Sequence, residues 1–185
     1  TAGDAWVIKN SATDGTWSTA AGFPVALTND DAYWFAIVSP LADGNVHVTA
    51  YRWGADIPAI GFYSSDGGST FTSEGNITTS NIEGDSGSAA RVGRIEAAGL
   101  GDGVVHLVYQ TSDQRVVYRK RNADGSFADE VELRSAPMQV NNISSPRLTF
   151  GANGTLYVTW TGVWLDYCVW LAAYVDGAWQ PARVL

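Results

Sequence analysis

The sequence predicts an all-β protein built from repeated antiparallel units. An Asp-Gly turn followed within a few residues by an aromatic side chain occurs four times, and its aspartates lie 52, 58 and 52 positions apart. Twenty glycines, eight tryptophans and the lack of a helical hydrophobic period favour strands and tight turns over helices. Because repeat periods near 50 residues are typical of propellers and arrays, we expect a β-propeller, a ring of small sheets called blades.

The Asp-Gly turns are expected to close β-hairpins. Glycine adopts the positive φ that primed turns require, and aspartate can bond to its own backbone two residues further on. A second Asp-Gly or Asn-Gly turn precedes three of the four, at Asp43-Gly44, Asp102-Gly103 and Asn153-Gly154. Two hairpins per repeat give four antiparallel strands, here named A to D, which is the blade of a propeller.

The repeats divide the chain into a single propeller segment spanning residues 1–185. A half blade with only the C–D hairpin is expected at 1–27, and complete blades at 33–80, 89–137 and 145–185. Propellers normally close into rings, so that no long strand edge stays unpaired. Three alternatives follow: a segment of a larger propeller, a four-bladed ring with one degenerate blade, or a ring completed by another chain.

The turn between residues 64 and 71 carries the most detailed motif. Its Ser64, Asp66, Gly68 and Thr70 match the pattern Ser-x-Asp-x-Gly-x-Thr-Trp, and Phe71 stands in place of the Trp. This pattern resembles the Asp-box that closes the C–D hairpin in the sialidase-like, or BNR-repeat, β-propellers. The other three turns keep only Asp-Gly and the aromatic residue. The resemblance implies a structural role, on the face away from any ligand, for the four turn aspartates: Asp14, Asp66, Asp124 and Asp176.

A ligand is expected on the opposite face, where the B–C loops and the linkers between blades lie. Tryptophan beside carboxylates and amides is common in sugar sites, because the indole stacks on C–H groups while polar neighbours bind hydroxyls. Packing between blades is an open alternative for the two loop tryptophans. The candidate ligand-binding residues are Arg52, Trp53, Asp56, Asp113, Trp164 and Asp166.

The resemblance also leaves an exo-glycosidase as an alternative. Sialidase-like propellers include enzymes with an arginine triad, a Tyr nucleophile with a Glu partner, and an Asp acid. Arg91, Arg94 and Arg147 precede or enter expected inner strands, but the Arg-Ile-Pro signature of such enzymes is absent. We therefore assign no catalytic residue and expect a non-catalytic module for binding or assembly.

The histidines and the clustered basic residues are expected to have structural positions in the blades rather than roles in a binding site. His47 and His106 each stand three residues after the glycine of an A–B turn, so a repeated structural position is favoured over a metal site. We accordingly expect no metal and no cofactor. The basic cluster Arg115, Arg119, Lys120 and Arg121 is expected to be a solvated blade edge.

Charge and composition narrow the class of partner. A net charge of −8 disfavours nucleic acid and anionic membranes, and no apolar run is long enough for membrane insertion. An acidic, Lys-poor chain rich in Thr and Gly favours an extracytoplasmic location, secreted or at the cell surface. Glycan is the first candidate partner. A protein, or the remainder of the propeller ring at the open edge, is the second.

Overall fold

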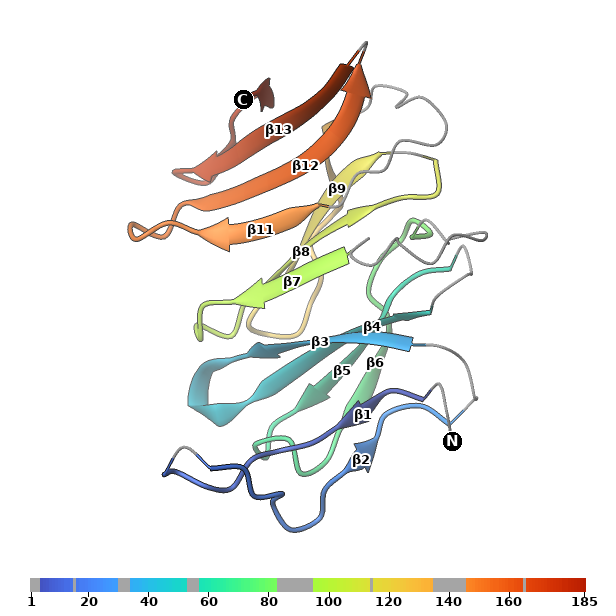
Figure 1. The fold of residues 1–185 in the computed structure, drawn as a ribbon, viewed down its shortest axis with the longest axis vertical. Coiled ribbons are helices and arrows are strands. Elements are labelled where there is room, and N and C mark those ends of the chain that lie inside the picture. Colours follow the sequence, from blue (N-terminus) through green and yellow to red (C-terminus); the bar gives the residue numbers. More distant parts are fainter. Residues whose placement is uncertain are drawn as a thin grey trace.

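The computed structural model describes residues 4–14, 16–29, 34–52, 57–82, 95–113, 115–134, 146–164 and 166–185. These residues form β-sheets arranged in a row in chain order, with one short 3-10 turn at Ala42–Gly44 (Figure 1). Within the described ranges, no helix has the length and apolar character needed to cross a membrane. The architecture is therefore all-β.

Four sheets follow one another along the described chain. The N-terminal hairpin pairs β1 (Trp6–Val7) with β2 (Val25–Ala26). Blade I contains, in spatial order, β3 (Trp34–Pro40), β4 (Val46–Arg52), β5 (Ile60–Ser64) and β6 (Thr72–Asn76). Blade II contains β7 (Ile95–Gly99), β8 (Val105–Gln110), β9 (Val116–Arg121) and β10 (Val131–Arg134). Blade III contains β11 (Arg147–Phe150), β12 (Leu156–Trp164), β13 (Asp166–Val175) and β14 (Ala178–Trp179), and β15 (Arg183–Val184) also pairs with β13.

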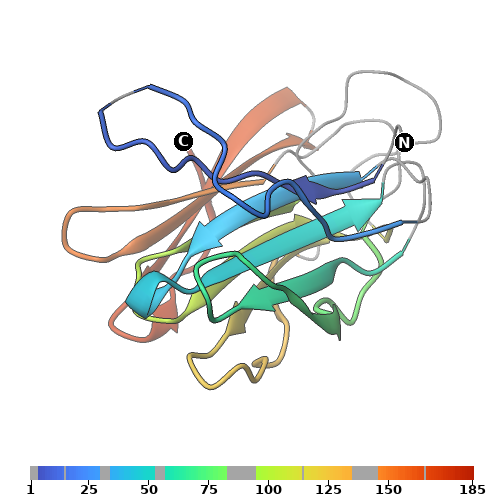
Figure 2. The same ribbon diagram turned by 90° about the horizontal axis from the view of Figure 1, so that it is seen from below.

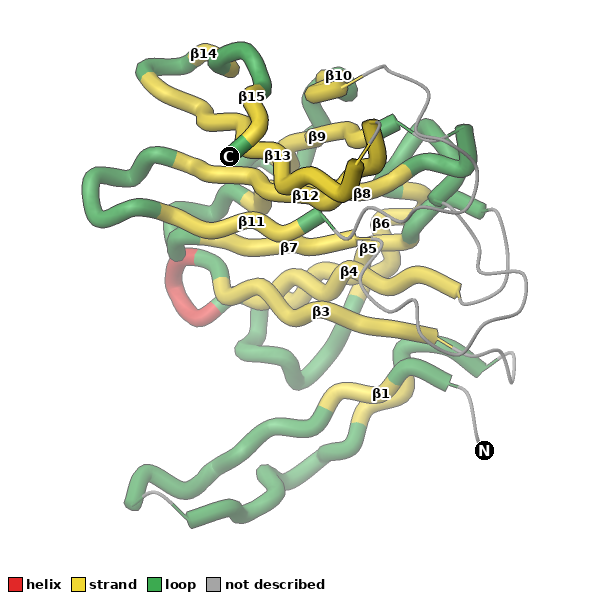
Figure 3. The backbone as a smooth tube through the Cα atoms, turned by 45° about the horizontal axis from the view of Figure 1, so that its top comes forward, coloured by secondary structure: helices red, strands yellow, loops and turns green. Residues whose placement is uncertain are grey.

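All neighbouring strands are antiparallel, and each blade is a meander from the inner strand outward. The inner strands β3, β7 and β11 lie side by side (Figure 3). Seen from below, the N-terminal hairpin lies in front of blade I (Figure 2). Four-stranded antiparallel meanders stacked in this way are the blades of a β-propeller.

The middle strand β8 shows why the blades stack face to face. Its Val105, Leu107 and Tyr109 are fully buried in the core between blades I and II. Val108, one step out of phase, is fully buried in the core between blades II and III. Because successive side chains on a strand point to opposite faces, this one strand contributes apolar side chains to two cores.

The inner strand β3 is covered on one side only. Phe35 and Ile37 pack against blade II, whereas Val38, on the other side, is 56% exposed. In blade II, Ile95 and Ala97 of β7 lie in the core shared with blade I and are only 1% and 7% exposed. The N-terminal hairpin packs on the residues of β4 and β5 and leaves Val38 uncovered. The side of β3 that faces the N-terminal hairpin is therefore uncovered at Val38. In a complete propeller, the inner strands of a preceding blade would pack against this side.

The turn between β5 and β6 is organised by the carboxylate of Asp66. Ser64 donates its hydroxyl to Oδ1 at 2.8 Å, and Thr70 donates its backbone N–H to Oδ1 at 2.9 Å and its hydroxyl to Oδ2 at 2.7 Å. Gly67 and Gly68 follow with φ of 71° and 88°, which favours glycine. The hydrogen bonds from Thr70, followed by that from Ser64, lower the pKa of Asp66 to about 2.

The other three Asp-Gly turns are simpler. Asp14 accepts the N–H and hydroxyl of Thr16, and Asp124 accepts the same two groups from Ser126. Asp176 itself has a φ of 49° and the following glycine a φ of 83°, so both central residues of that turn are left-handed. This geometry belongs to a two-residue primed hairpin turn.

Replacing Asp66 with Ala should lower the free energy of unfolding, because Ser64 and Thr70 lose the acceptor that fixes the turn. The check is a urea unfolding curve followed by tryptophan fluorescence. Asp129→Ala, which removes an exposed aspartate from the loop between β9 and β10, is the matched control and should leave the midpoint in place. Equal midpoints for the two variants would contradict the role given to Asp66.

Candidate functional site

A polar cavity of about 290 Å³ lies where blade I meets blade II. It sits between the segment after β6 and the turn that joins β8 to β9. Strand β9 begins at this turn and ends at the Asp124 turn, so the cavity and the Asp-Gly turns occupy opposite ends of the blades. The described residues that line it are Thr79, Ser80, Asn81, Ser112, Asp113 and Arg115.

Backbone bonds fix the two segments that form the cavity. Ile82 pairs with Ile57 on one side and with Thr111 on the other. The N–H of Ser112 donates to the carbonyl of Asn81 at 3.0 Å. Because Ile82 is buried in the core between the blades, the linker after blade I is held against the β8–β9 turn of blade II.

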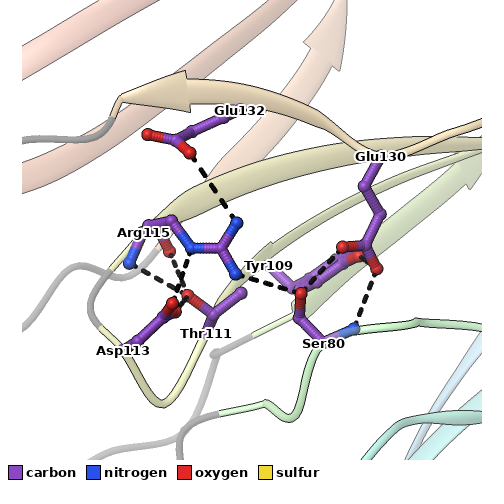
Figure 4. Close-up of polar contacts among 7 residues, drawn as sticks. All are labelled: Ser80, Tyr109, Thr111, Asp113, Arg115, Glu130 and Glu132. Atoms are coloured by element: carbon purple, nitrogen blue, oxygen red, sulfur yellow. Dashed lines mark hydrogen bonds and ion pairs between the residues drawn. The ribbon is translucent and has the colours of Figure 1, made fainter.

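The carboxylate of Glu130 joins the two blades beneath the cavity (Figure 4). It accepts the N–H of Thr79 at 2.6 Å, the N–H of Ser80 at 3.1 Å and the hydroxyl of Ser80 at 2.8 Å. Tyr109, whose side chain is buried in blade II, donates its hydroxyl to the same carboxylate. Burial alone would raise the pKa of Glu130, but the bonds from Tyr109, Thr79 and Ser80 outweigh it and lower the pKa to about 2. Burial and the bond to Glu130 raise the pKa of Tyr109.

Arg115 forms the other half of the network in Figure 4. Its Nε donates to Asp113 Oδ2 at 2.8 Å, its Nη2 donates to Ser80 Oγ at 3.1 Å, and its Nη1 lies 3.7 Å from Glu132 Oε2. Thr111 donates its hydroxyl to Asp113 Oδ1 at 2.5 Å and accepts the backbone N–H of Arg115 at 2.9 Å. The hydrogen bond from the hydroxyl of Thr111 lowers the pKa of Asp113, burial opposes this, and the bond from Arg115 lowers the pKa further. The guanidinium of Arg115 therefore holds the turn in place.

These contacts divide the network into two kinds of group. Glu130 and Arg115 are engaged by several protein partners each, so they position the walls of the cavity. Asp113, by contrast, keeps 62% of its side chain exposed, and its carboxylate can accept further hydrogen bonds. The cavity thus offers fixed hydroxyl, amide and carboxylate groups, which suit a hydroxyl-rich ligand.

Of the candidate ligand-binding residues predicted from the sequence, the structure places only some at the cavity. Asp113 lines the cavity. Arg52 is the exposed last residue of β4, opposite Trp34 in the sheet, and it is not among the lining residues. Trp53 and Asp56 lie outside the described residues.

Trp164 and Asp166 were expected in a B–C loop. This expectation is wrong, because the backbones of both residues belong to strands. Trp164 ends β12, Asp166 begins β13, and the two residues are partners in the antiparallel register of these strands. The hairpin is long because residues 156–175 carry apolar and β-branched side chains almost without interruption, which favours continued strand pairing.

The basic cluster is not the solvated edge that the sequence suggested. Arg121 is 3% exposed and donates from Nε and Nη2 to Glu74 Oε1 at 2.9 and 2.6 Å. Its guanidinium also lies 4.9 Å from the ring centre of Tyr63. Arg119 donates to the carbonyl of Ile77 at 2.8 Å. Both arginines bind across the interface between blades I and II.

Of the three arginines considered for an enzyme, Arg147 begins β11 and forms an ion pair with Glu96 of β7. Arg91 and Arg94 lie outside the described residues. The structure therefore places no arginine of this set at the cavity between blades I and II among the residues it describes.

The two histidines take part in packing contacts. His47 is fully buried, with Nε2 3.1 Å from Glu74 Oε2. His106 lies with Nδ1 2.8 Å from the hydroxyl of Tyr118, and its ring meets Phe150 edge-on. In the part of the chain that the structure describes, no group of three or more metal-binding side chains comes together.

Several residues of the site were missed by sequence reasoning, namely Thr79, Ser80, Asn81, Tyr109, Thr111, Glu130 and Glu132. Glu130 and Ser80 are 50 positions apart, so no local motif joins them. The contact joins the segment after β6 of blade I to the residue before β10 of blade II, which are not equivalent positions of the repeat. It depends on how the two blades pack, and no signal in the sequence points to it.

The fold and the site define a β-propeller with a polar cavity between two blades. No family model and no curated protein matches the sequence. Among solved structures, the chain is similar to the alpha-L-arabinanase of Penicillium chrysogenum complexed with arabinobiose, with 16% identity, a TM-score of 0.59 and coverage of 100% of this chain and 59% of that one. It is also similar to the GH93 alpha-L-arabinofuranosidase of Fusarium graminearum with arabinobiose, with 12% identity, a TM-score of 0.55 and coverage of 99% and 58%. The chain spans about three fifths of the length of both structures, and at these identities the likeness shows the fold alone.

Glu130 should make stability depend on pH in the acid range. Its pKa falls from an ordinary 4.5 to about 2 in the folded protein, so its contribution is complete above the ordinary value and is lost as the pH drops through the folded value. Glu130→Gln should therefore lower stability at neutral pH and flatten the decline between about pH 4.5 and 2. Urea midpoints across this window would show it. Asp129→Asn is the control, and a decline equally steep in Glu130→Gln would contradict the assignment.

Proposed function

We propose that this chain is a non-catalytic, extracytoplasmic propeller segment that binds glycan in the cavity between blades I and II. The observation that carries the proposal is the exposed carboxylate of Asp113, held by Thr111 and Arg115 at the wall of a polar cavity of about 290 Å³. Protein sites for sugars use a few fixed polar groups in this way. The acidic, Lys-poor composition supports a location outside the cytoplasm.

The similar structures support a glycan ligand. Both were solved with arabinobiose bound, so propellers of this general shape can accept a neutral disaccharide. We extend that ligand class, and no particular sugar, to this chain.

We further propose that the Asp66 turn is an Asp-box of the sialidase-like, BNR-repeat type. The hydrogen bonds from Ser64 and Thr70 to Asp66 support this assignment. In this proposal Phe71 is the aromatic that closes the motif, and Asp14, Asp124 and Asp176 mark degenerate copies at the same end of the blades.

An exo-glycosidase whose remaining blades lie outside these 185 residues is the alternative within the same ligand class. The non-catalytic proposal is favoured because Glu130 and Arg115 are engaged by protein groups and Arg147 pairs with Glu96. A hydrolysis assay distinguishes the exo-glycosidase alternative from the non-catalytic proposal. Release of a fluorophore from an aryl arabinofuranoside or sialoside by the pure protein would contradict the non-catalytic proposal.

A second function, assembly, is supported by the open side of β3. The N-terminal hairpin packs on the residues of β4 and β5 next to it, so the covered surface continues directly into the uncovered Val38. We propose that strands from the remainder of the propeller ring cover this surface and extend the sheet at β1. The length of the two similar structures beyond the matched part supports such additional strands.

Asp113→Ala should weaken glycan binding by about tenfold, because a carboxylate that accepts sugar hydroxyls contributes roughly as much as other charge-assisted hydrogen bonds. Binding is measured on a glycan array and then by calorimetry with the best oligosaccharide. Asp124→Ala removes an aspartate at the opposite end of blade II and should bind normally. Equal loss in both variants, or an empty array, would contradict the proposal.

Val38→Lys should reduce concentration-dependent association of the isolated chain, since a charge on the open side of β3 opposes pairing of uncovered apolar surfaces. Sedimentation velocity over a range of concentrations measures this. Leu100→Lys changes an exposed apolar residue beyond the end of β7 and serves as the control. Identical behaviour of the two variants would argue against an assembly surface at Val38.

A further inference from the structure

The aromatic side chain after each Asp-Gly turn of the three blades packs toward the unit that precedes its own blade. Phe71 of blade I packs in the cluster that also holds Val7 of the N-terminal hairpin. Phe127 of blade II packs on the core shared with blade I. Trp179 of blade III meets the ring of Tyr118 in blade II edge-on, with the ring centres 4.9 Å apart. All three turn aromatics are partly buried by this contact.

Trp17 is the fourth turn aromatic, and it remains on the surface with 63% of its side chain exposed. Val7 of the same hairpin packs toward blade I, so its neighbour Trp6 points the other way and is 47% exposed. Val38 is uncovered on the side of blade I next to this hairpin. The N-terminal end of the row therefore exposes an apolar surface that includes Trp17.

A pocket of about 330 Å³ lies at the other end of the row, on blade III. Val158 and Ala172 are buried against blade II, so the residues that alternate with them on β12 and β13 point away from blade II. Val169, on this outer side, is 44% exposed. The described residues that line this blade III pocket are Tyr157, Leu171, Ala173, Gln180, Pro181 and Arg183.

Two lining residues occupy the positions at which blade II receives aromatic side chains from blade III. Tyr157 and His106 each lie three residues after the glycine of an A–B turn, and His106 meets the ring of Phe150 in blade III edge-on. Leu171 pairs with the second residue after Tyr157, just as Tyr118 pairs with the second residue after His106. Tyr118 is the residue that meets the turn aromatic of blade III. The repeat therefore places the blade III pocket where the turn aromatic of another unit would pack.

The assembly function proposed above requires a unit that covers the open side of β3, and blade III of a second copy can supply it. Building on that function, we infer that copies of this chain associate head to tail, with Trp17 of one copy seated in the blade III pocket of the next. The same chain exposes both halves of the contact, the unpacked turn aromatic at one end and the pocket at the other. Unlike surfaces that pair in this way form a heterologous interface.

The chemistry of the pocket suits an indole. Tyr157 and Leu171 offer apolar surface, and the side-chain oxygen of Gln180 can accept the indole N–H. The guanidinium of Arg183 can lie over the ring face, an arrangement that favours Trp over other aromatic side chains. A tryptophan that enters a pocket at the centre of an interface is a common source of binding energy.

Sedimentation velocity over a range of concentrations tests the contact. Trp17→Ala removes the indole, and Ala173→Arg places a charged side chain in the pocket. Each should weaken association about tenfold or more, as the loss of a central aromatic anchor does. Leu100→Ala and Val131→Arg change exposed apolar residues of blade II and are the matched controls. Urea midpoints equal to that of the unchanged chain establish that each variant folds.

A mixture of the two variants gives the sharper test. Trp17→Ala keeps the pocket and Ala173→Arg keeps the indole, so one junction can form between them and the mixture should stop at a dimer with one chain of each kind. Association that Trp17→Ala leaves unchanged, or a mixture that stays monomeric, would overturn the inference. If Val38→Lys weakens association and Trp17→Ala does not, the assembly function stands and the Trp17 contact is wrong. If the unchanged chain does not associate at all, the assembly function itself is contradicted.

Discussion

The contact between blades I and II is the interaction on which the rest of the described structure depends. An apolar core that includes Leu107 and Tyr109 fills its centre, while Glu130 and Ser80 join its cavity end and Arg121 and Glu74 lie nearer the Asp-Gly turns. Apolar burial supplies most of the attraction, because it scales with area and needs no particular geometry. The polar pairs set the register of one blade on the other.

The buried charges explain why that register is well defined. Arg121 and Glu74 are largely removed from water, and such a pair adds little net stability because desolvation offsets the attraction. Separating the two partners would leave a buried charge uncompensated, which costs several kcal/mol in typical proteins. A shifted blade would separate them, along with the bonds of Glu130 to Thr79 and Ser80. Of the groups that hold the blades in register, Thr79 and Ser80 also line the cavity.

The sequence predicted those features of the fold that depend on neighbouring residues. The Asp66 turn forms because its donors, its carboxylate and its glycines all lie within a few positions of one another, and the Asp176 turn follows from two adjacent left-handed residues. The pairs Glu130–Ser80 and Arg121–Glu74 span 50 and 47 positions, so they depend on how whole blades meet. Trp164 was misplaced in a loop, although the nearly continuous apolar and β-branched residues at 156–175 favour strand pairing. Asp113 was found because it lies in a short polar turn between two apolar strands.

The arrangement of units in a row has a consequence for how the chain opens. Each blade makes its main contacts with its neighbours in the sequence, as in linear repeat proteins, where stability is close to a sum of unit and interface terms. The two short strands of the N-terminal hairpin form the smallest sheet among the described residues. The walls of the cavity belong instead to the interface of two four-stranded blades, so local opening of that hairpin leaves their geometry unchanged.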